Sequence, residues 1–238
     1  QCVRQALDED LGEAGDVTSS VAVPADRRGS ARIVAREDGV LAGIDAVHLT
    51  FAAVDDDVRV DVQRGDGAGL EIGDTVCTLH GRARSLLAGE RVALNFLQRL
   101  SGVATQARAY RRAIQGTDAV VLETRKTTPG WRTLEKYAVR VGGGTNHRIG
   151  LFDQVLLKEN HFALAAPRSY REVVESAVAA RLDAPVIAEA RTVEEAKEAV
   201  AGGAGIVMLD NFEPGAPLAA AVQQVRKFAA ELGRTVAI

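Results

Sequence analysis

The stretch APVIAEARTVEEAKEAVAGGAGIVMLD, residues 184–210, decides the fold because it places one helical segment between two short apolar runs. The first run ends at Glu189 and the second at Asp210. Between the runs, Thr192 and Glu195 form a T-x-x-E capping box that predicts the start of a helix, and the glycine pair 202–203 predicts its end. A strand, a helix and a strand in this order are typical of a parallel sheet.

The same rhythm extends from about residue 117 to the end of the sequence. Further apolar runs are AVVL at 119–122, QVLL at 154–157 and TVAI at 235–238, and another helix is expected from Pro217 to Leu232. Spacings of roughly 20–35 residues fit the βα units of a barrel, in which reactive side chains lie at the carboxyl ends of strands. Five visible strands are too few to close an eight-stranded barrel, so we expect an open or incomplete one.

Residues 16 to about 88 have a different pattern, which predicts short strands and hairpins. The segment from Ala31 to Arg36 leads into Asp-Gly, and the segment from Val58 to Gln63 alternates apolar with polar residues before a second Asp-Gly. The stretch from Gly69 to Gly81 is typical of a further strand pair. From Glu90 to about Ile114 the apolar residues follow a helical period, with Ser101-Gly102 as a candidate break.

Composition excludes several classes of protein. With 238 residues, 47% hydrophobic content and a formal net charge of -3, the chain is expected to be a folded protein without a general attraction to nucleic acid. The cysteines, Cys2 and Cys77, cannot form a disulfide framework. No apolar run approaches the roughly 18 residues of a membrane span, and the acidic residues 8–10 argue against a signal peptide. We therefore expect a cytoplasmic protein that does not insert into a membrane.

The chemistry is concentrated between Glu123 and His161, where seven lysines and arginines meet only four acids. The cations are Arg125, Lys126, Arg132, Lys136, Arg140, Arg148 and Lys158. A solvated helix face is the simpler explanation for Arg132 and Lys136, which are four residues apart on an expected helix. The four cations that lie directly beside apolar runs are better explained by a site for a polyanionic small molecule.

A triple glycine at 142–144 precedes His147 and Arg148 in the same stretch. Glycines allow the backbone to approach a phosphate or carboxylate closely, but three of them are as often a flexible turn. His147 lies between an asparagine and an arginine, which makes it a candidate donor to an anion. For His161, which follows another asparagine, a structural and a functional role remain equally open.

These residues form blocks that resemble the quinolinate phosphoribosyltransferase family. The blocks are EDLGEAGDVTS from Glu9, ERVALNFLQRLSG from Glu90, ETRKTTPG from Glu123, LEKYAVR from Leu134, GGGTNHRIGL from Gly142 and LLKENH from Leu156. They occur in the family's order and cover nearly the whole chain. A related group associated with molybdenum transport shares the arginine-lysine motif, but Asn146 and the LLKENH block favour the quinolinate branch.

The resemblance implies an α/β fold with two domains. Residues 1–102 would form an N-terminal α/β sandwich domain with helical segments, and residues 103–238 an open, seven-stranded α/β barrel domain. Family members continue past TVAI into a Ser-Gly-Gly turn and a Gly-x-Leu-Thr segment that bind the donor's 5-phosphate, so we expect the barrel to be truncated at its C-terminus here. Members are usually homodimers with a shared active site, to which Arg91 would be donated by the partner subunit.

The resemblance also implies the reaction: transfer of a phosphoribosyl group from phosphoribosyl pyrophosphate to quinolinate with decarboxylation, in de novo NAD biosynthesis. The products would be nicotinate mononucleotide, pyrophosphate and carbon dioxide. The implied quinolinate ligands are Arg91, Arg125, His147, Arg148 and Lys158. Lys126 would bind the diphosphate or quinolinate, and Mg²⁺ is expected on the pyrophosphate, with Asp210 as its protein ligand.

The residues expected to act in catalysis are Lys126, Lys158, Glu189 and Asp210. Where the family motif reads E-V-E, this chain has Ile187-Ala188-Glu189. Side chains two apart on a strand point to the same face, so either Glu189 supplies the carboxylate or the site is weakened by Ile187. Two alternatives stay open at this point: a phosphoribosyltransferase acting on nicotinate, and a quinolinate-binding relative without catalytic activity.

Overall fold

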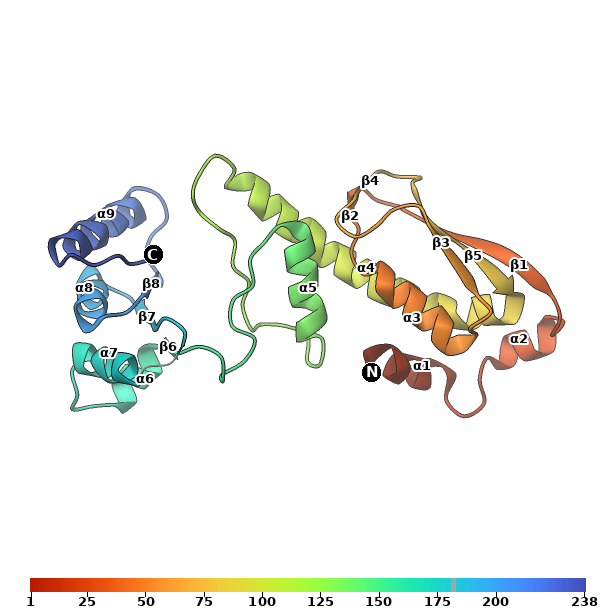
Figure 1. Ribbon diagram of the computed structural model, residues 1–238, viewed down its shortest axis with the longest axis horizontal. Helices are drawn as coiled ribbons and strands as arrows, with labels where there is room; N and C mark the ends of the chain where they lie inside the picture. The colour runs from red at the N-terminus through yellow and green to blue at the C-terminus, as the bar shows by residue number, and fades with distance from the viewer. Residues whose placement is uncertain (181–182) are drawn as a thin grey trace. The chain divides into compact units, whose positions relative to one another are not determined.

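A computed structural model of the protein describes residues 1–180 and 183–238. These residues form two compact units, unit 1 (Gln1–His147) and unit 2 (Arg148–Ile238) (Figure 1). Among the described residues, no helix has both the length and the apolar composition needed to cross a membrane. The expected boundary between residues 102 and 103 falls inside a helix and stays a prediction.

Unit 1 contains an antiparallel sheet and five helices in its described residues. Its elements are α1 (Cys2–Leu11), α2 (Val17–Ala22), β1 (Arg28–Val34), β2 (Gly39–Val40), α3 (Ile44–Val54), β3 (Arg59–Val62), β4 (Gly69–Leu70), β5 (Thr75–Arg82), α4 (Ala83–Ala113) and α5 (Arg132–Gly142). The sheet has the strand order β1-β5-β3, and β2 pairs separately with β4. Helices α3 and α4 share a buried apolar core with β5.

The strands expected around Ala31 and Val58 are confirmed as β1 and β3, but two other expectations are wrong. The strand β3 pairs with β5 instead of with the next strand along the chain, so the expected hairpin does not form. The segment Ile44–Val54 is a helix, α3, within a region expected to hold only strands. Its buried residues Ile44, Val47 and Phe51 recur at helical spacing, which the short-strand interpretation overlooked.

Helix α4 runs without interruption through Ser101 and Gly102, so the candidate break does not occur. A glycine inside a helix costs only about 1 kcal/mol relative to alanine, and tertiary packing readily outweighs that cost. Leu100 and Ala104 are buried on either side of the pair. The Ser101 hydroxyl, moreover, accepts a hydrogen bond from the Ala42 amide at 3.0 Å, which joins α4 to the chain before α3.

Helix α5 packs against the second half of α4. The contact is closest at Gly142, where an added Cβ would meet the Ala104 carbonyl oxygen and lie 2.6 Å from the Ala107 methyl carbon. The segment before α5 is fixed by Trp131, whose ring stacks on Phe96 of α4 at a centroid separation of 4.7 Å. The long helix therefore serves as the support for α5 and for the loop that precedes it.

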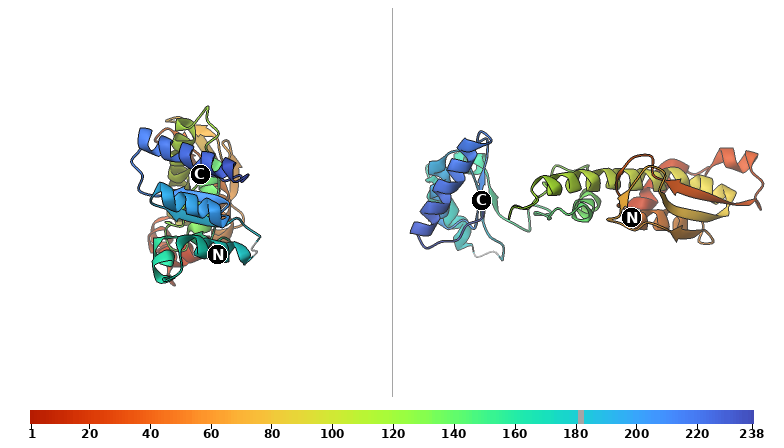
Figure 2. Two further views of the ribbon diagram at one scale, coloured as in Figure 1. Left: turned by 90° about the vertical axis from the view of Figure 1, so that its left-hand side faces the viewer. Right: turned by 90° about the horizontal axis from the view of Figure 1, so that it is seen from above.

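Unit 2 consists of a parallel three-stranded sheet covered by helices. Its described elements are β6 (Leu156–Leu157), α6 (Glu159–Leu164), α7 (Tyr170–Ala179), β7 (Ile187–Ala190), α8 (Val193–Gly202), β8 (Ile206–Leu209) and α9 (Ala216–Glu231). Helices α7, α8 and α9 pack on one face of the sheet, with α8 in contact with both of its neighbours (Figures 1 and 2). The predicted alternation of strand and helix is confirmed.

Two of the five expected strands are reduced to single bridges. Leu122 of the AVVL run pairs only with Thr145, and Ala237 of the TVAI run pairs only with Ile206, both in parallel. The helices around residues 159–164 and 170–179 were not expected from the sequence. The mixed α/β class is confirmed, and closure of the strands into a barrel stays a prediction.

The close approach of α4 and α5 predicts opposite effects of one substitution at two glycines. Gly142→Ala should lower the free energy of unfolding by about 1–3 kcal/mol, since its methyl group would overlap the backbone of α4. Gly102→Ala, in open space on α4, should raise it by about 0.5–1 kcal/mol through helix propensity. Urea unfolding of both variants measures the difference, and equal effects would contradict the packing described.

Candidate active site

Three candidate residues of unit 2 lie at one edge of its sheet. Lys158 directly follows β6, Glu189 lies in β7, and Asp210 directly follows β8. Because the three strands are parallel, their carboxyl ends meet at the same edge, where reactive side chains of α/β proteins gather. The Asp210 amide also donates to the Ala190 carbonyl at 2.9 Å, so the register continues to the acid.

Lys158 and Glu189 form an ion pair at this edge. The Lys158 Nζ donates to the Glu189 Oε2 at 2.6 Å, and the residue Glu189 is only 6% exposed. About half of the Lys158 side chain is exposed, so its ammonium group remains partly hydrated. A buried carboxylate is costly without a charged partner, and Lys158 provides that partner.

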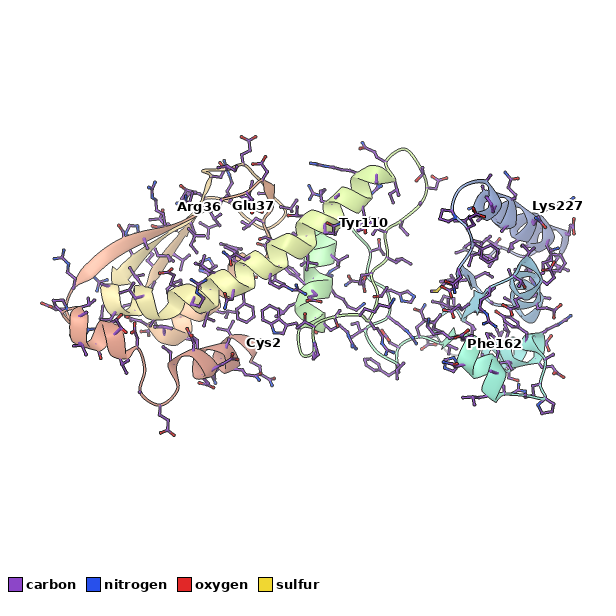
Figure 3. All side chains as sticks on the ribbon, turned by 180° about the vertical axis from the view of Figure 1, so that it is seen from behind. Cys2, Arg36, Glu37, Tyr110, Phe162 and Lys227 are labelled. Carbon is purple, nitrogen blue, oxygen red and sulfur yellow. The ribbon has the colours of Figure 1, made fainter. Side chains whose placement is uncertain are left out.

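The backbone of Glu189 is held from the helical side of the sheet. The Tyr170 hydroxyl donates to the Glu189 carbonyl at 2.8 Å, and burial raises the pKa of Tyr170, so it remains a donor. The ring of Tyr170 stacks on Phe162, which is labelled in Figure 3, at a centroid separation of 3.8 Å. These contacts come from α7 and α6 and fix the strand that carries the carboxylate.

Ile187 lies on the same sheet face as Glu189, as the alternation predicts. Ala188 and Ala190 belong to the core beneath the helices, whereas Ile187 does not and is 1% exposed. Its partners in register are Leu156 and Ile206, so its neighbours across the sheet are apolar. Glu189 is consequently the residue through which β7 presents a carboxylate beside Lys158.

Asp210 is half-buried and accepts a hydrogen bond from the Asn211 side-chain amide at 2.8 Å. No group of three or more histidine, cysteine or acidic residues that could hold a metal ion occurs among residues 1–180 and 183–238. The donor set therefore does not form a protein-only cage for Mg²⁺. Mg²⁺ commonly binds through one or two carboxylates together with substrate phosphates and water, and Asp210 fits that arrangement.

In unit 1, Arg125 carries a buried guanidinium group. Its Nε and Nη1 atoms are buried and have no hydrogen-bond partner within the part of the chain that the structure describes. A buried donor left without a partner costs about 1–3 kcal/mol, and more when it is charged. The Nε–H points along one edge of the guanidinium plane and the Nη1–H toward its end, so a carboxylate or phosphate group at each of these positions would satisfy the two nitrogens.

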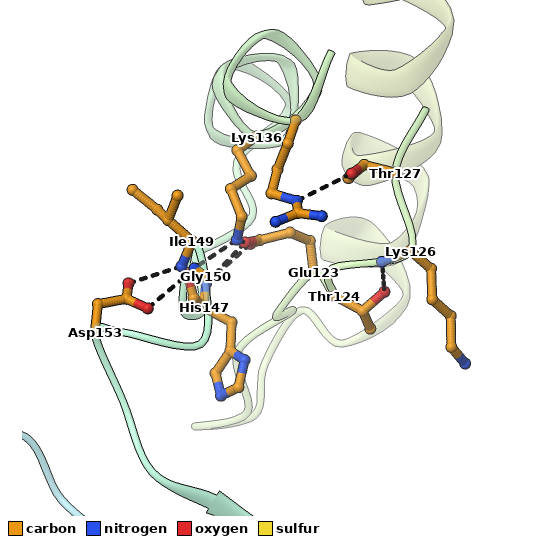
Figure 4. Close-up of polar contacts among 10 residues, drawn as sticks. Glu123, Thr124, Lys126, Thr127, Lys136, His147, Ile149, Gly150 and Asp153 are labelled. Carbon is orange, nitrogen blue, oxygen red and sulfur yellow. Dashed lines mark hydrogen bonds and ion pairs between the residues drawn. The ribbon is translucent and has the colours of Figure 1, made fainter. Parts of the chain in front are cut away.

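Lys126 and Arg91 present their side chains to solvent. The Lys126 side chain is exposed and extends away from Glu123 (Figure 4), while its amide donates to the Thr124 hydroxyl at 3.1 Å. Arg91 is exposed on α4. Exposed cations of this kind remain accessible to a ligand or to a second chain.

Both polar groups of the His147 backbone are held by side chains. Its amide donates to the Glu123 carboxylate at 2.9 and 3.0 Å, and its carbonyl accepts from the Lys136 Nζ at 2.9 Å. Glu123 and Lys136 are also paired with each other. Figure 4 shows the imidazole directed away from this pair, on the other side of the backbone.

The solvated-face interpretation is wrong for Lys136, which is 2% exposed. A lysine on a helix is usually exposed to solvent. Lys136 is buried because it pairs with Glu123, which lies thirteen residues earlier in the sequence. Arg132 is half-buried and donates to the Thr127 hydroxyl at 3.2 Å. Lys136 and Glu123 are thus residues of the site region that the sequence pattern did not single out for binding.

The remaining histidine and arginine have local partners in unit 2. Arg148 donates to the Gln154 carbonyl at 3.3 Å. The His161 Nδ1 accepts a hydrogen bond from the Lys158 amide at 2.9 Å, which satisfies a backbone donor at the start of α6. The structural alternative for His161 is therefore supported. Of the eight predicted site residues, the structure brings Lys158, Glu189 and Asp210 to one edge of unit 2. Arg148 also belongs to unit 2, and the other four, Arg91, Arg125, Lys126 and His147, belong to unit 1.

Comparisons with known proteins agree with this arrangement of motifs. The model of the quinolinate phosphoribosyl transferase N-terminal domain matches residues 16–101, and that of the C-terminal domain matches residues 103–237. The probable nicotinate-nucleotide pyrophosphorylase [carboxylating] of Bacillus subtilis is 41% identical over 210 residues, which are 87% of this chain and 70% of that protein. The corresponding chloroplastic enzyme of Oryza sativa is 41% identical over 198 residues, 82% of this chain and 53% of its own length.

Solved structures give the same result at the level of the fold. NadC from Streptococcus pyogenes has a TM-score of 0.88 at 38% identity, and the match covers 96% of this chain and 79% of the NadC chain. The nicotinate-nucleotide pyrophosphorylase from Francisella tularensis has a TM-score of 0.88 at 35% identity, covering 98% and 79%. These matches confirm the resemblance inferred from the six sequence blocks.

The apolar surroundings of Ile187 predict a stability difference between two substitutions. Ile187→Glu should lower the free energy of unfolding by at least about 3 kcal/mol, because it buries a second carboxylate that no cation faces in register. Ile187→Val removes one methylene and should cost about 0.5–1.5 kcal/mol. Denaturant unfolding compares them, and a glutamate variant as stable as the valine variant would contradict this account of the strand.

Proposed function

The chain belongs to the quinolinate phosphoribosyl transferase family, and on that premise we propose that it transfers a phosphoribosyl group from phosphoribosyl pyrophosphate to quinolinate with loss of carbon dioxide. The product would be nicotinate mononucleotide, an intermediate of de novo NAD biosynthesis. The observation that carries the proposal is the buried Arg125 guanidinium, whose Nε and Nη1 have no partner among the described residues. Quinolinate has two adjacent carboxylates, and together they would offer acceptors to the two nitrogens, which point to different edges of the guanidinium group.

Substrate recognition in this proposal depends on cations. By the family resemblance, Arg125, His147, Arg148 and Lys158 would bind the carboxylates of quinolinate. Lys126, whose side chain is exposed, would bind the diphosphate of the donor or share quinolinate with Arg125. Nicotinate has a single carboxylate and would leave part of this positive charge without a partner, which argues for the dicarboxylate.

The chemical step follows from these charges. The bond from ribose C1 to the pyrophosphate oxygen breaks, the pyridine nitrogen bonds to C1, and pyrophosphate leaves with the bonding electron pair. The bond from pyridine C2 to its carboxylate then breaks, carbon dioxide leaves, and a proton replaces it at C2. The Glu189 carboxylate, held by Lys158, would stabilise the positive charge that develops on the ribose.

No covalent nucleophile is required, because binding energy and fixed charges orient the reactants. Mg²⁺ bound to the donor would neutralise charge on the pyrophosphate as it leaves, and Asp210 is the residue that would contact it. We also propose a homodimer, which the exposed position of Arg91 on α4 supports. The two free cysteines support a reducing, cytoplasmic setting.

The proposal predicts release of labelled carbon dioxide from 2-carboxyl-labelled quinolinate, only when phosphoribosyl pyrophosphate and Mg²⁺ are both present. Nicotinate supplied in place of quinolinate should give no nucleotide. Quinolinate binding without release would favour a non-catalytic relative, and nucleotide formation from nicotinate would favour the alternative enzyme.

Arg125→Met should lower kcat/KM at least about a hundredfold, since two charged hydrogen bonds contribute about 1.5–3 kcal/mol each.

A stability measurement separates this role of Arg125 from a structural one. Arg125→Met should leave the free energy of unfolding unchanged or raise it, because it removes two buried donors that have no partner among the described residues. Lys126→Met, at an exposed neighbour, should change stability by less than about 0.5 kcal/mol. A large loss of stability in Arg125→Met would show that the guanidinium supports the fold, and would contradict the binding role.

A further inference from the structure

Helix α5 carries two consecutive charged residues that are buried, Glu135 at 7% and Lys136 at 2% exposure. Charged side chains are rarely this buried unless each has partners. The partners of both lie in the segments that hold Arg125, Lys126 and His147. The pair Glu135-Lys136 therefore connects α5 to those parts of unit 1 that the proposed reaction requires.

Lys136 and Glu123 together bind both polar groups of the His147 backbone. The Lys136 ammonium contacts the Glu123 carboxylate and donates to the His147 carbonyl, while both oxygens of Glu123 accept from the His147 amide (Figure 4). With these contacts the backbone of His147 cannot turn without breaking a partly buried hydrogen bond to a charged side chain. The backbone position from which the imidazole projects thus depends on Lys136, a buried residue of α5.

Glu135 binds the other end of the loop. Its carboxylate accepts from the Thr128 hydroxyl at 2.8 Å and the Thr128 amide at 3.3 Å, and from Arg99 of α4 at 2.7 Å. Desolvation alone would raise the pKa of Glu135, but the hydrogen bonds from Arg99 and Thr128 outweigh it and the pKa lies below its ordinary value. Glu135 therefore stays ionised in its buried position.

The loop between these two attachments contains Arg125 and Lys126. Glu123 lies at its start and Thr128 near its end, and each is bound by one of two adjacent residues of α5. The Leu122–Thr145 bridge joins the start of the loop to the segment of His147. Since α5 itself packs on α4, the loop is fixed through α5 to the long helix of the unit.

We propose that Glu135 and Lys136 are positioning residues for substrate binding, which set the loop of Arg125 and the backbone of His147 at the spacing that a vicinal dicarboxylate requires. Neither residue touches the ligand. The inference rests on the proposed function for the identity of that ligand, but the positioning of His147 is a property of unit 1 alone. The selectivity for two carboxylates would then depend on two buried residues of one helix in addition to the residues that bind the ligand.

The first experiment uses the full chain with Lys136→Met and the double variant Glu123→Gln/Lys136→Met. The single variant leaves the Glu123 carboxylate buried without its cation, whereas the double variant has the same net charge as the parent. Calorimetry gives the dissociation constants for quinolinate and for nicotinate. We expect the ratio of the two affinities to fall at least about tenfold in both variants, since loss of spacing weakens the two-point contact more than the one-point contact.

The double variant excludes a purely electrostatic effect. If Lys136 acted only through its charge, the added Glu123→Gln change would balance the lost ammonium and restore the parent ratio, and that result would overturn the proposal. Val76→Ala, a core truncation in β5, is the control for reduced stability in the same unit. It should lower the unfolding temperature and leave the affinity ratio within about twofold of the parent, whereas an equal fall in this control would also overturn the proposal.

An amide-exchange measurement tests the positioning without any ligand. In the parent chain the His147 amide is bonded to Glu123 and should exchange slowly, and in both variants it should exchange at least about tenfold faster. Unchanged exchange would overturn the inference even if turnover were observed. Conversely, failure of the parent chain to bind quinolinate would contradict the proposed function, while faster exchange in the variants would still support the positioning role.

Discussion

The ion pair between Glu123 and Lys136 is the interaction on which the arrangement of unit 1 around its candidate ligand residues depends. Both side chains are charged and almost completely removed from water. Loss of either one would leave the other as a buried charge without its counter-charge, which would lower the free energy of unfolding. Because the pair also takes up the amide and the carbonyl of His147, a single buried contact determines the course of two chain segments. The packing of α5 on α4, with a glycine at the closest approach, is what allows Lys136 to reach them.

Each unit contains an ion pair between a lysine and a buried glutamate, but the two lysines differ in their exposure to solvent. In unit 2, Lys158 neutralises a buried carboxylate while keeping about half of its own surface in water, so it can still exchange partners. In unit 1, Lys136 is buried, and its ammonium group contacts the Glu123 carboxylate and the His147 carbonyl. Arg125 differs from both, since it has buried nitrogens without a partner among the described residues. A half-exposed lysine suits a group that acts on a substrate, and an enclosed lysine suits one that holds other groups in place.

Much of the fold could be predicted from local patterns, and what could not depended on distant contacts. The strands and the helix from 184 to 210 could be predicted because the N-cap Thr192, whose side chain accepts from the Glu195 amide, and the glycine after α8 are local signals. The AVVL and TVAI runs were predicted as full strands, but a strand also needs a partner strand along its length. Among the described residues each run forms only a single bridge. The helix α3 was missed because the helical spacing of its buried apolar residues lies between segments with strand patterns, where it was overlooked.

The candidate site shows the same division between local and distant information. Lys158, Glu189 and Asp210 were predictable because each follows or ends an apolar run, and parallel strands bring such ends together. The alternation rule also identified Glu189, and not Ile187, as the source of the carboxylate on β7. Lys136 could not be found this way, since the rule for helices assigns a lysine to solvent unless a partner is known. Its partner lies before the helix, beyond a loop of cations, and only the folded chain brings the two charges into contact.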